Sequence, residues 1–324
     1  MKRYPEIEDK LMSLGEAVGR FVKDGSQVAL GGFTVNRNPM AVAYEIIRRG
    51  VKHLHIVCHS HGQALDVLVG AGCVKRIEMA YGANGRFAST CIRFRKAVER
   101  EEVEIEDYSN NQMSMRFLAG ALGIPFIPSR SGFGTDLIGR EGFGPAIRSE
   151  AKVASRKLVV VSNPFNEKEN VVLLPALTPD VALVHAQYVG EDGTVRIKGL
   201  TFADLEQAKS AGAVIVTCEE IVPKAYIRLD PDQNSLPPFL IDAIVKVPYG
   251  AYPTACRLFY DYDAKHLNMY KEAARDDETF GRYLDDWVYS LKSHDQLLDR
   301  IGGAGLMTIR ANPVIGYIPG LDRR

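Results

Sequence analysis

The residues best suited to ligand binding or catalysis form a glycine turn from Leu30 to Pro39, with the sequence LGGFTVNRNP. Gly31 and Gly32 follow a short apolar run, and Asn38 before a proline suits the start of a helix. Bare backbone amides and a helix N-terminus at the end of a buried strand favour a negatively charged ligand oxygen. A tight strand-to-helix connection is the commoner use of two glycines. The turn matches neither the dinucleotide-binding fingerprint nor the phosphate loop.

A second glycine-rich loop and an asparagine add groups that a ligand could approach. The loop from Ser129 to Gly139 contains Gly132 and Gly134, so it either admits a ligand to the main chain or serves as a surface turn. Asn84 ends another apolar run, where its side-chain amide is able to stabilise a developing oxyanion. An asparagine in a turn more often bonds its own backbone, and both interpretations stay open.

Four histidines, His53, His55, His59 and His61, occupy odd positions of one apolar stretch. With the period of two of a β-strand they face the same side, as metal ligands would. The first and the last would lie roughly 26 Å apart at about 3.3 Å per residue, so only neighbours could share an ion. Because that face offers no cysteine or carboxylate at ligand spacing, we predict no metal site.

Two groups in the second half also have a chemical and a structural interpretation. Cys218, Glu219 and Glu220 end an apolar run, where a thiol nucleophile or paired carboxylates could act. The more common arrangement is a small buried cysteine followed by glutamates that cap the next segment. His185 lies within an apolar run, and we expect it to be a hydrogen-bonded core residue rather than a base.

Alternating helices and strands must position these groups. A helix-spaced apolar pattern over residues 11–22 is followed by the apolar run SQVALGGF, which predicts a helix and then a buried strand. The alternation continues through HLHIVCHS, VKRIEMAY, VEIED and IPFIPS. It predicts an α/β fold with an open, mostly parallel sheet and helices on both faces. Open α/β sheets bind ligands at the carboxyl ends of their strands, where the glycine turn and Asn84 would lie.

The second half is richer in strands and ends in helices. Asp192-Gly193 separates VALVHAQYV from TVRI as a hairpin turn would, which predicts some antiparallel strands. From about residue 265 the composition becomes helical and charged. No flexible linker or fixed repeat separates the parts. We therefore expect an α/β domain over residues 1–264 and a C-terminal helical extension over residues 265–324, packed on the same body.

Composition argues against several classes of partner. The 324 residues carry 40 basic and 40 acidic side chains, and a net charge of zero gives no general electrostatic attraction to nucleic acid or to an anionic membrane. No stretch approaches the run of about eighteen apolar residues that spans a bilayer. The five cysteines form no CxxC pair, so neither a disulfide scaffold nor a zinc knuckle is indicated. We expect a cytoplasmic protein.

Taken together, these segments resemble the alpha subunits of family I CoA-transferases. Members of that family have Asp-Gly, two free positions, three apolar residues and Gly-Gly-Phe before a proline, as in DGSQVALGGFTVNRNP. Arg37 departs from the pattern, because many members have glycine there. The segments EDYS, ALGIPFIP, VSNPF, VALVHAQ, DGTVRI, VTCEEI and PYGAYP are similar to the branch of these alpha subunits that serves glutaconate. The resemblance covers about residues 10 to 300.

The resemblance implies an active site shared by two chains. In the family, the nucleophile is a glutamate in a Ser-Glu-Asn-Gly-type motif of a homologous beta subunit, and this sequence contains no such motif. The implied ping-pong reaction passes from acyl-CoA through an acyl-glutamyl anhydride to an enzyme-bound CoA thioester, whose CoA then moves to a carboxylic acid. CoA and acyl-CoA are substrates, and no permanently bound cofactor is implied. The expected assembly is a heterodimer that associates into α2β2 or larger.

In such a site this chain would supply oxyanion donors and a wall against water, because an anhydride must be kept from hydrolysis. Asn84 is the candidate oxyanion donor, and Phe33 is expected to form part of the wall. The guanidinium of Arg37 suits a carboxylate and favours a short dicarboxylic acyl group such as glutaconyl; the alternative is a surface arginine. The residues expected to contact substrate or CoA are Gly31, Gly32, Phe33, Thr34, Arg37, Gly132, Gly134 and Thr135.

Three other functions stay open. By resemblance, the same scaffold serves acyl-CoA hydrolysis, ring opening or decarboxylation when the partner lacks the glutamate. A non-catalytic regulatory protein that binds acyl-CoA is a second alternative. A sugar-phosphate isomerase on a related topology is a third, and the lack of a basic phosphate pocket in these motifs disfavours it.

Overall fold

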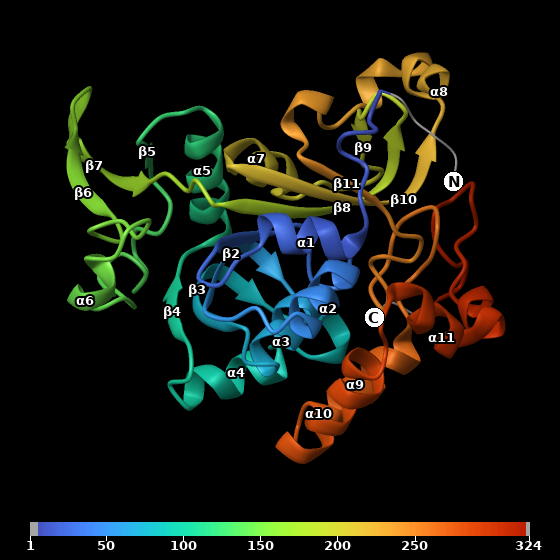
Figure 1. The fold of residues 1–324 in the computed structure, drawn as a ribbon. Coiled ribbons are helices and arrows are strands. Elements are labelled where there is room, and N and C mark those ends of the chain that lie inside the picture. The colour runs from blue at the N-terminus through green and yellow to red at the C-terminus, as the bar shows by residue number, and fades with distance from the viewer. Residues whose placement is uncertain (1–5, 322–324) are drawn as a thin grey trace.

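The computed structural model describes residues 6–321, which are built around an eight-stranded sheet (Figure 1). The strand order is β11-β10-β8-β1-β2-β3-β4, and β9 pairs with β8. Every pair is parallel except β8 with β9. The predicted open, mostly parallel sheet is therefore confirmed. Its strands are β1 (Gln27–Leu30), β2 (Leu54–His61), β3 (Val74–Gly82), β4 (Glu104–Asp107), β8 (Val181–Gly190), β9 (Val195–Arg196), β10 (Ala213–Val222) and β11 (Ala243–Lys246).

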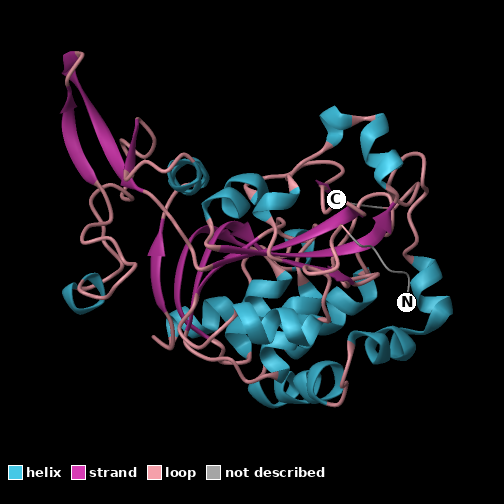
Figure 2. Cartoon of the chain, turned by 45° about the horizontal axis from the view of Figure 1, so that its top comes forward, coloured by secondary structure: helices cyan, strands magenta, loops and turns pink. Residues whose placement is uncertain are grey.

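Helices cover both faces of this sheet (Figure 2). Helices α1 to α4 pack in sequence on one face, and α5 and α7 pack on each other and on the opposite face. Alternate residues of β1 point to the two faces. Val28 and Leu30 belong to the hydrophobic core beneath α1–α4, and Ala29 belongs to the core beneath α5. The helices are α1 (Leu14–Phe21), α2 (Met40–Arg48), α3 (Gln63–Gly70), α4 (Ile92–Glu99), α5 (Asn110–Ala121), α7 (Asp204–Ser210) and the shorter α6 (Pro145–Arg148) and α8 (Lys224–Leu229). None of the helices within residues 6–321 combines the length and apolarity needed to cross a membrane.

The predicted hairpin joins β8 to β9. Gly193 adopts φ +84°, which favours glycine, and the Asp192 carboxylate accepts a hydrogen bond from the N–H of Thr194 at 3.0 Å. The turn chemistry that was visible in the sequence therefore sets the one antiparallel pair of the large sheet.

The segment IPFIPS does not continue the parallel sheet, so that expectation is wrong. It forms β5 (Phe126–Ser129), which pairs antiparallel with β7 (Asn166–Pro175); β7 also pairs with β6 (Val159–Asn163). This three-stranded sheet projects from the body (Figures 1 and 2). Pro128 has no N–H to donate, and proline is tolerated in edge strands, which is the position of β5.

The C-terminal segment is helical, as predicted. It contains α9 (Ala264–Ala273), α10 (Asp277–Leu284), the π-helical turn η4 (Asp285–Tyr289) and α11 (His294–Thr308). The Tyr283 hydroxyl lies 3.1 Å from that of Tyr44 on α2, so these helices share the core of the α1–α4 face. The boundary at residues 264/265 stays a prediction, and residues 1–5 and 322–324 of the two ranges lie outside the described residues.

Replacing Gly120 with alanine tests the packing of α5. A β-carbon there would lie 1.9 Å from the carbonyl oxygen of Leu177 and 2.9 Å from Cβ of Ser210 on α7. We expect Gly120→Ala to lower the free energy of unfolding by about 1–3 kcal/mol, measured by urea denaturation. Gly281→Ala is the matched control, because Gly281 lies in α10 with open space around its α-carbon and alanine favours a helix. Equal stability of the two variants would contradict this packing.

Candidate active site

The loops that follow β1, β2 and β3 meet at Gly62. A β-carbon at Gly62 would lie 2.3 Å from the carbonyl oxygen of Thr34, 2.5 Å from Oδ1 of Asn84 and 2.7 Å from the carbonyl oxygen of Ala83. Only glycine permits such an approach. Two predicted site residues, Thr34 and Asn84, therefore lie together at the carboxyl edge of the sheet. Gly62 was not among the predicted site residues, although its place directly after a predicted strand was a usable signal.

Gly31 and Gly32 are both needed for close packing. A β-carbon would lie 2.8 Å from the Leu183 carbonyl oxygen at Gly31 and 2.5 Å from that of Arg37 at Gly32. The N–H of Gly31 donates to Leu183 at 2.9 Å, and the N–H of Gly32 donates to Oδ1 of Asp204 at 2.7 Å. The expectation that these two amides serve an oxyanion is therefore wrong, because both already have acceptors.

The tip of the same turn offers better donors. Phe33 and Asn36 close it with two backbone hydrogen bonds of 2.9 and 2.7 Å. Between them, Thr34 adopts φ +46°, which is uncommon for a β-branched residue and is often found at functional sites. Among the hydrogen bonds of the described residues, none engages the N–H of Thr34 or of Val35. These successive amides are candidates for binding a negative oxygen.

Asn84 is buried beside them. Its side-chain amide donates to Oε1 of Gln63 at 2.8 Å, while Oδ1 of Asn84 and Nε2 of Gln63 have no partner among the described residues. A half-turn of both amides would keep this hydrogen bond and direct the Asn84 NH₂ group toward Gly62. The predicted oxyanion donor therefore lies at the edge where the loops meet.

Unpartnered polar atoms gather at this edge. They include Nδ1 of His59 and Nδ1 of His61, at the end of β2, together with the two amide atoms of Gln63 and Asn84. Buried polar atoms in folded proteins nearly always have a partner. The site therefore has unused hydrogen-bonding capacity for a ligand, for water or for another chain. From the sequence, both histidines were considered only as metal ligands, and neither was predicted at this site.

His61 and the aromatic pair Phe33 and Phe202 lie beside the glycine turn of the candidate site. Nε2 of His61 lies 2.9 Å from the carbonyl oxygen of Gly31, and burial lowers the pKa of His61 to about 4, so the neutral ring donates to that carbonyl. The ring of Phe33 stacks on Phe202 with centroids 4.3 Å apart, and the His59 ring lies 6.0 Å from Phe33. Burial also lowers the pKa of His59, against the nearby charge of Asp204.

Arg37 holds a carboxylate, but it is one from its own chain. The guanidinium lies 2.6 Å from Oδ2 of Asp204 and donates to the carbonyl oxygens of His185 at 3.1 Å and Leu200 at 2.8 Å. Both charged side chains are buried, with Arg37 only 3% exposed, so the surface alternative is wrong. The donors of the Arg37 guanidinium already have acceptors. We therefore propose that Arg37 positions the turn, in place of the predicted contact with a substrate carboxylate.

The Gly132 loop is attached to the start of α5. Ser109 and Gln112 form the capping box of α5, the Ser109 hydroxyl lies 3.0 Å from that of Ser131, and the Gln112 amide donates to the Ser131 carbonyl. A β-carbon at Gly132 would lie 2.7 Å from Gln112. The hydroxyl of Thr135 donates within the loop, to the carbonyl of Gly132.

This loop lies at the carboxyl edge, because α5 starts there. Asn110, the first residue of α5, accepts a hydrogen bond of 2.6 Å from Ser60 near the end of β2. The loop also contacts other elements, because Arg130 pairs with Glu169 on β7 and the Leu137 carbonyl accepts a hydrogen bond from the Lys157 ammonium at 2.9 Å. The expected contact of Gly132, Gly134 and Thr135 with substrate or CoA stays a prediction.

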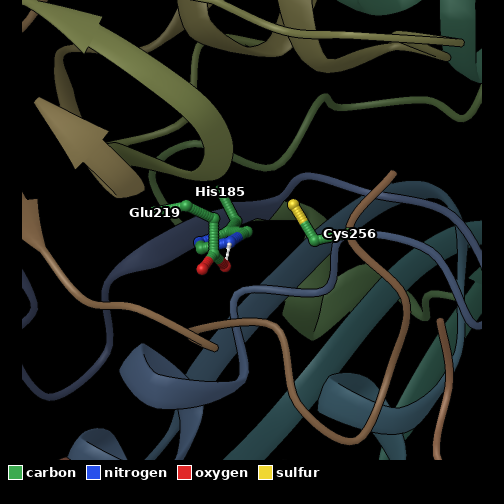
Figure 3. A group of neighbouring side chains, drawn as sticks. All are labelled: His185, Glu219 and Cys256. Atoms are coloured by element: carbon green, nitrogen blue, oxygen red, sulfur yellow. Dashed lines mark hydrogen bonds and ion pairs between the residues drawn. The ribbon is translucent and has the colours of Figure 1, made fainter. Parts of the chain in front are cut away.

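His185, Glu219 and Cys256 form the one group of three potential metal ligands that the described residues bring close enough together (Figure 3). All three side chains are buried. Nε2 of His185 lies 2.7 Å from Glu219, and its Nδ1 lies 2.8 Å from the Thr217 hydroxyl. His185 is therefore the hydrogen-bonded core residue that we predicted.

Glu219 is part of the same network and does not cap a following segment, so that expectation is wrong. Its carboxylate accepts hydrogen bonds from the Tyr260 hydroxyl at 2.5 Å and from the N–H of Tyr249 at 2.7 Å, as well as facing His185. These donors already occupy both oxygens. Burial raises the pKa of the Cys218 and Cys256 thiols, which makes both poor nucleophiles.

Comparison with known proteins identifies the family. A sequence model of the coenzyme A transferase family matches residues 11–247. The chain belongs to this family. It is 39% identical to the A subunit of glutaconate CoA-transferase from Acidaminococcus fermentans, over 95% of this chain and 97% of the relative. It is 34% identical to the A subunit of 3-oxoadipate CoA-transferase from Pseudomonas knackmussii, over 90% and 98% of the two chains.

Solved structures agree with this assignment. The crystal structure of the Acidaminococcus fermentans glutaconate CoA-transferase superposes with a TM-score of 0.92 at 39% identity, covering 95% of this chain and 98% of that chain. The decarboxylase AibA/AibB superposes with a TM-score of 0.72 at 30% identity, over 85% and 98% of the two chains. The chain is thus the alpha subunit of a family I CoA-transferase, as the resemblance in its sequence implied.

Removing the charge of Asp204 tests the buried ion pair. Asp204→Asn keeps the shape of the side chain but leaves the Arg37 guanidinium without a counter-ion. We expect the free energy of unfolding, measured in urea, to fall by about 3–5 kcal/mol. Glu169→Gln is the control, because Glu169 pairs with Arg130, whose side chain is 74% exposed, and its loss should change stability by less than about 1 kcal/mol. Similar small losses in both would argue against the pair.

The lowered pKa of His61 predicts a pH dependence of stability. The neutral ring is favoured in the folded chain, so its contribution is complete above the ordinary pKa of 6.5 and is lost as the pH falls toward 4. His61→Gln keeps a donor near the Nε2 position and does not titrate. We expect this variant to lose roughly 2–3 kcal/mol less than the wild type between pH 7 and pH 4. The exposed His53→Gln should leave the slope unchanged; a wild-type slope in His61→Gln would refute the assignment.

Proposed function

We propose that this chain, together with a homologous partner, moves CoA between an acyl-CoA and a short dicarboxylic acid such as glutaconate. The observation that carries the proposal is the 39% identity, over nearly the whole chain, to a relative whose name specifies glutaconate. A second relative is named for 3-oxoadipate, which is also a dicarboxylic acid. Because both named acids are dicarboxylic, we propose a dicarboxylate as the acid substrate, with glutaconate as the first candidate.

The nucleophile comes from the partner in this proposal. The loops that meet at Gly62 contribute amides and neutral rings, and the Asp204 carboxylate nearby is buried against Arg37. All five cysteines are buried and unpaired, which also suits a reducing cytoplasm. A homologous beta subunit would supply the glutamate, in a heterodimer assembled into α2β2 or larger. No bound cofactor is required, because CoA and acyl-CoA are the substrates.

The partner's glutamate attacks the thioester carbonyl and forms a tetrahedral centre with negative charge on oxygen. Collapse of this centre gives the acyl-glutamyl anhydride and CoA thiolate; the thiolate then attacks the glutamyl carbonyl and releases the first acid. The second acid takes the CoA by the reverse steps. In each step the N–H groups of Thr34 and Val35 and the Asn84 amide stabilise the oxyanion.

Other residues of this chain keep the donors in place and exclude water. His61 holds the carbonyl of Gly31 and Asp204 holds the N–H of Gly32, while Phe33 with Phe202 shields the anhydride from water. Each is therefore assigned a positioning or shielding role rather than a step in bond making.

A decarboxylase or hydrolase is the second candidate, favoured by the TM-score of 0.72 to the decarboxylase AibA/AibB. It requires a partner without the glutamate. A regulatory protein that only binds acyl-CoA is the third candidate, and it would show no exchange with any partner.

Purification of the chain from its own cells, with sequencing of the co-purifying partner and assay of the complex, separates these candidates. The proposal expects a homologous partner with a Ser-Glu-Asn-Gly-type motif and formation of glutaconyl-CoA from glutaconate and acetyl-CoA. A partner without the glutamate and an active hydrolase or decarboxylase would refute the transferase. A chain associated only with itself would refute the shared site.

Asn84→Ala tests the oxyanion role in the assembled enzyme. Loss of one preorganised donor should lower kcat about 100-fold or more, with a much smaller change in KM, measured as CoA transfer to glutaconate. Asn166→Ala, at the exposed start of β7 in the small sheet, is the control and should keep wild-type kcat. If Asn84→Ala raised only KM, the oxyanion role would have to be abandoned.

A further inference from the structure

The dicarboxylic acid of the proposed function needs a group that recognises its second carboxylate. The guanidinium of Arg37, which the sequence favours for this role, is buried against Asp204 and has its donors occupied. In the proposed function, the N–H groups of Thr34 and Val35 and the amide of Asn84 serve the carboxyl group that reacts. Because the acid is short, its second carboxylate requires a further donor close to these groups.

His59, near the end of β2, is a half-buried imidazole on this edge of the sheet. The centroid of its ring lies 6.0 Å from that of Phe33, which directly precedes Thr34. The next residue, Ser60, donates to the side chain of Asn110 at the start of α5. The imidazole is therefore a close neighbour of the two free amides of the glycine turn, on a strand end that is tied to α5.

The ring of His59 has unused hydrogen-bonding capacity. Neither of its nitrogens has a hydrogen-bond partner within residues 6–321; Nδ1 is buried, whereas Nε2 reaches the surface. A buried N–H group without a partner is rarer in proteins than a buried acceptor without one. This favours the tautomer that carries its proton on Nε2. The imidazole then presents an N–H donor to whatever binds at this edge.

The charged groups around His59 leave the free ring neutral. Burial lowers its pKa, against the charge of Asp204 on α7, which Arg37 neutralises. His61, on the same face of β2, is neutral as well, because burial lowers its pKa to about 4. The side chain of Asn110 at the start of α5 carries no charge. A carboxylate that bonds to Nε2 would favour the imidazolium and raise the pKa of His59, so that its binding takes up a proton.

We propose that His59 is a specificity-determining residue, whose Nε2–H donates to the second carboxylate of the dicarboxylic acid. The identity of the acid rests on the proposed function. Hydrogen bonds to an ionised acceptor are roughly twice as strong as those between neutral groups. A monocarboxylic acid offers no such acceptor to His59 and gains nothing from it. The imidazole therefore separates the two classes of acid.

Steady-state kinetics of the assembled enzyme with glutaconate and with crotonate test this role. Crotonate has the same double bond and lacks the second carboxylate. We expect His59→Phe, which keeps a ring and removes both nitrogens, to lower kcat/KM for glutaconate at least tenfold and to change that for crotonate far less. His53→Gln is the control, because His53 is exposed before the start of β2, and it should keep both values. Equal losses for both acids in His59→Phe would overturn the role.

The pH dependence gives a readout that a merely structural residue would not change. The ratio of kcat/KM for glutaconate to that for crotonate should rise as the pH falls from 8 to 6, because the imidazolium becomes populated while the second carboxylate stays ionised. His59→Gln keeps a neutral donor and does not titrate, so its ratio should be constant over this range. A wild-type slope in His59→Gln would assign the dependence to another group and overturn the role.

Calorimetric titration of the assembled complex with glutaconate separates this role from the proposed function. In two buffers of different ionisation enthalpy, we expect net proton uptake at pH 7 in the wild type and in His53→Gln, and none in His59→Gln. Binding with proton uptake but without CoA transfer to any acid would overturn only the proposed function. Transfer to glutaconate without proton uptake would overturn only the role of His59, and absence of both binding and transfer would overturn both.

Discussion

The buried pair of Arg37 and Asp204 is the interaction on which the candidate site depends. One carboxylate oxygen accepts the N–H of Gly32, the other faces the guanidinium, and the guanidinium also holds the carbonyls of His185 and Leu200. These contacts join the turn after β1 to β8 and to the segment before α7. A buried charge pair is stable only when its remaining donors are satisfied, and these carbonyls satisfy them. These contacts thereby fix the base of the turn, whose tip carries the Thr34 and Val35 N–H groups that lack an acceptor within residues 6–321.

Much of the fold was predictable because it follows from local pattern. The alternation of apolar runs with helix-spaced segments determined the parallel sheet, and Asp192-Gly193 determined the hairpin between β8 and β9. The prediction that IPFIPS continues the parallel sheet was wrong, because periodicity identifies a strand but not the sheet to which it belongs. Pro128, which favours an edge strand, was the signal that could have separated β5 from the others.

That several candidate residues would meet at one edge of the sheet was predictable from the sequence, but the availability of their individual atoms was not. The glycine turn and Asn84 were found because glycines and polar residues that end buried strands gather at one edge. Sequence cannot show which amides already have acceptors, so it cannot separate the N–H groups of Gly31 and Gly32, which are bonded, from that of Thr34 in the same predicted set. It also cannot show that Asp204, about 170 residues away, would form an ion pair with Arg37. Such long-range partners decide whether a group is available for chemistry, and they are set by tertiary packing.

In the proposed function, this chain supplies donors and its partner supplies the nucleophile, and a site shared in this way has a physical advantage. An anhydride survives only where water is excluded, and two surfaces that close on each other exclude water better than one open edge. The atoms left unpartnered at His59, Gln63 and Asn84 fit this arrangement, since desolvated polar groups are stabilised once a ligand or a second chain supplies partners. The neutral state of His61 serves the same end, because a charged ring beside the Gly31 carbonyl would be costly to bury. Under the proposed function, this edge is therefore preorganised for charge that develops on a substrate delivered by the partner's surface.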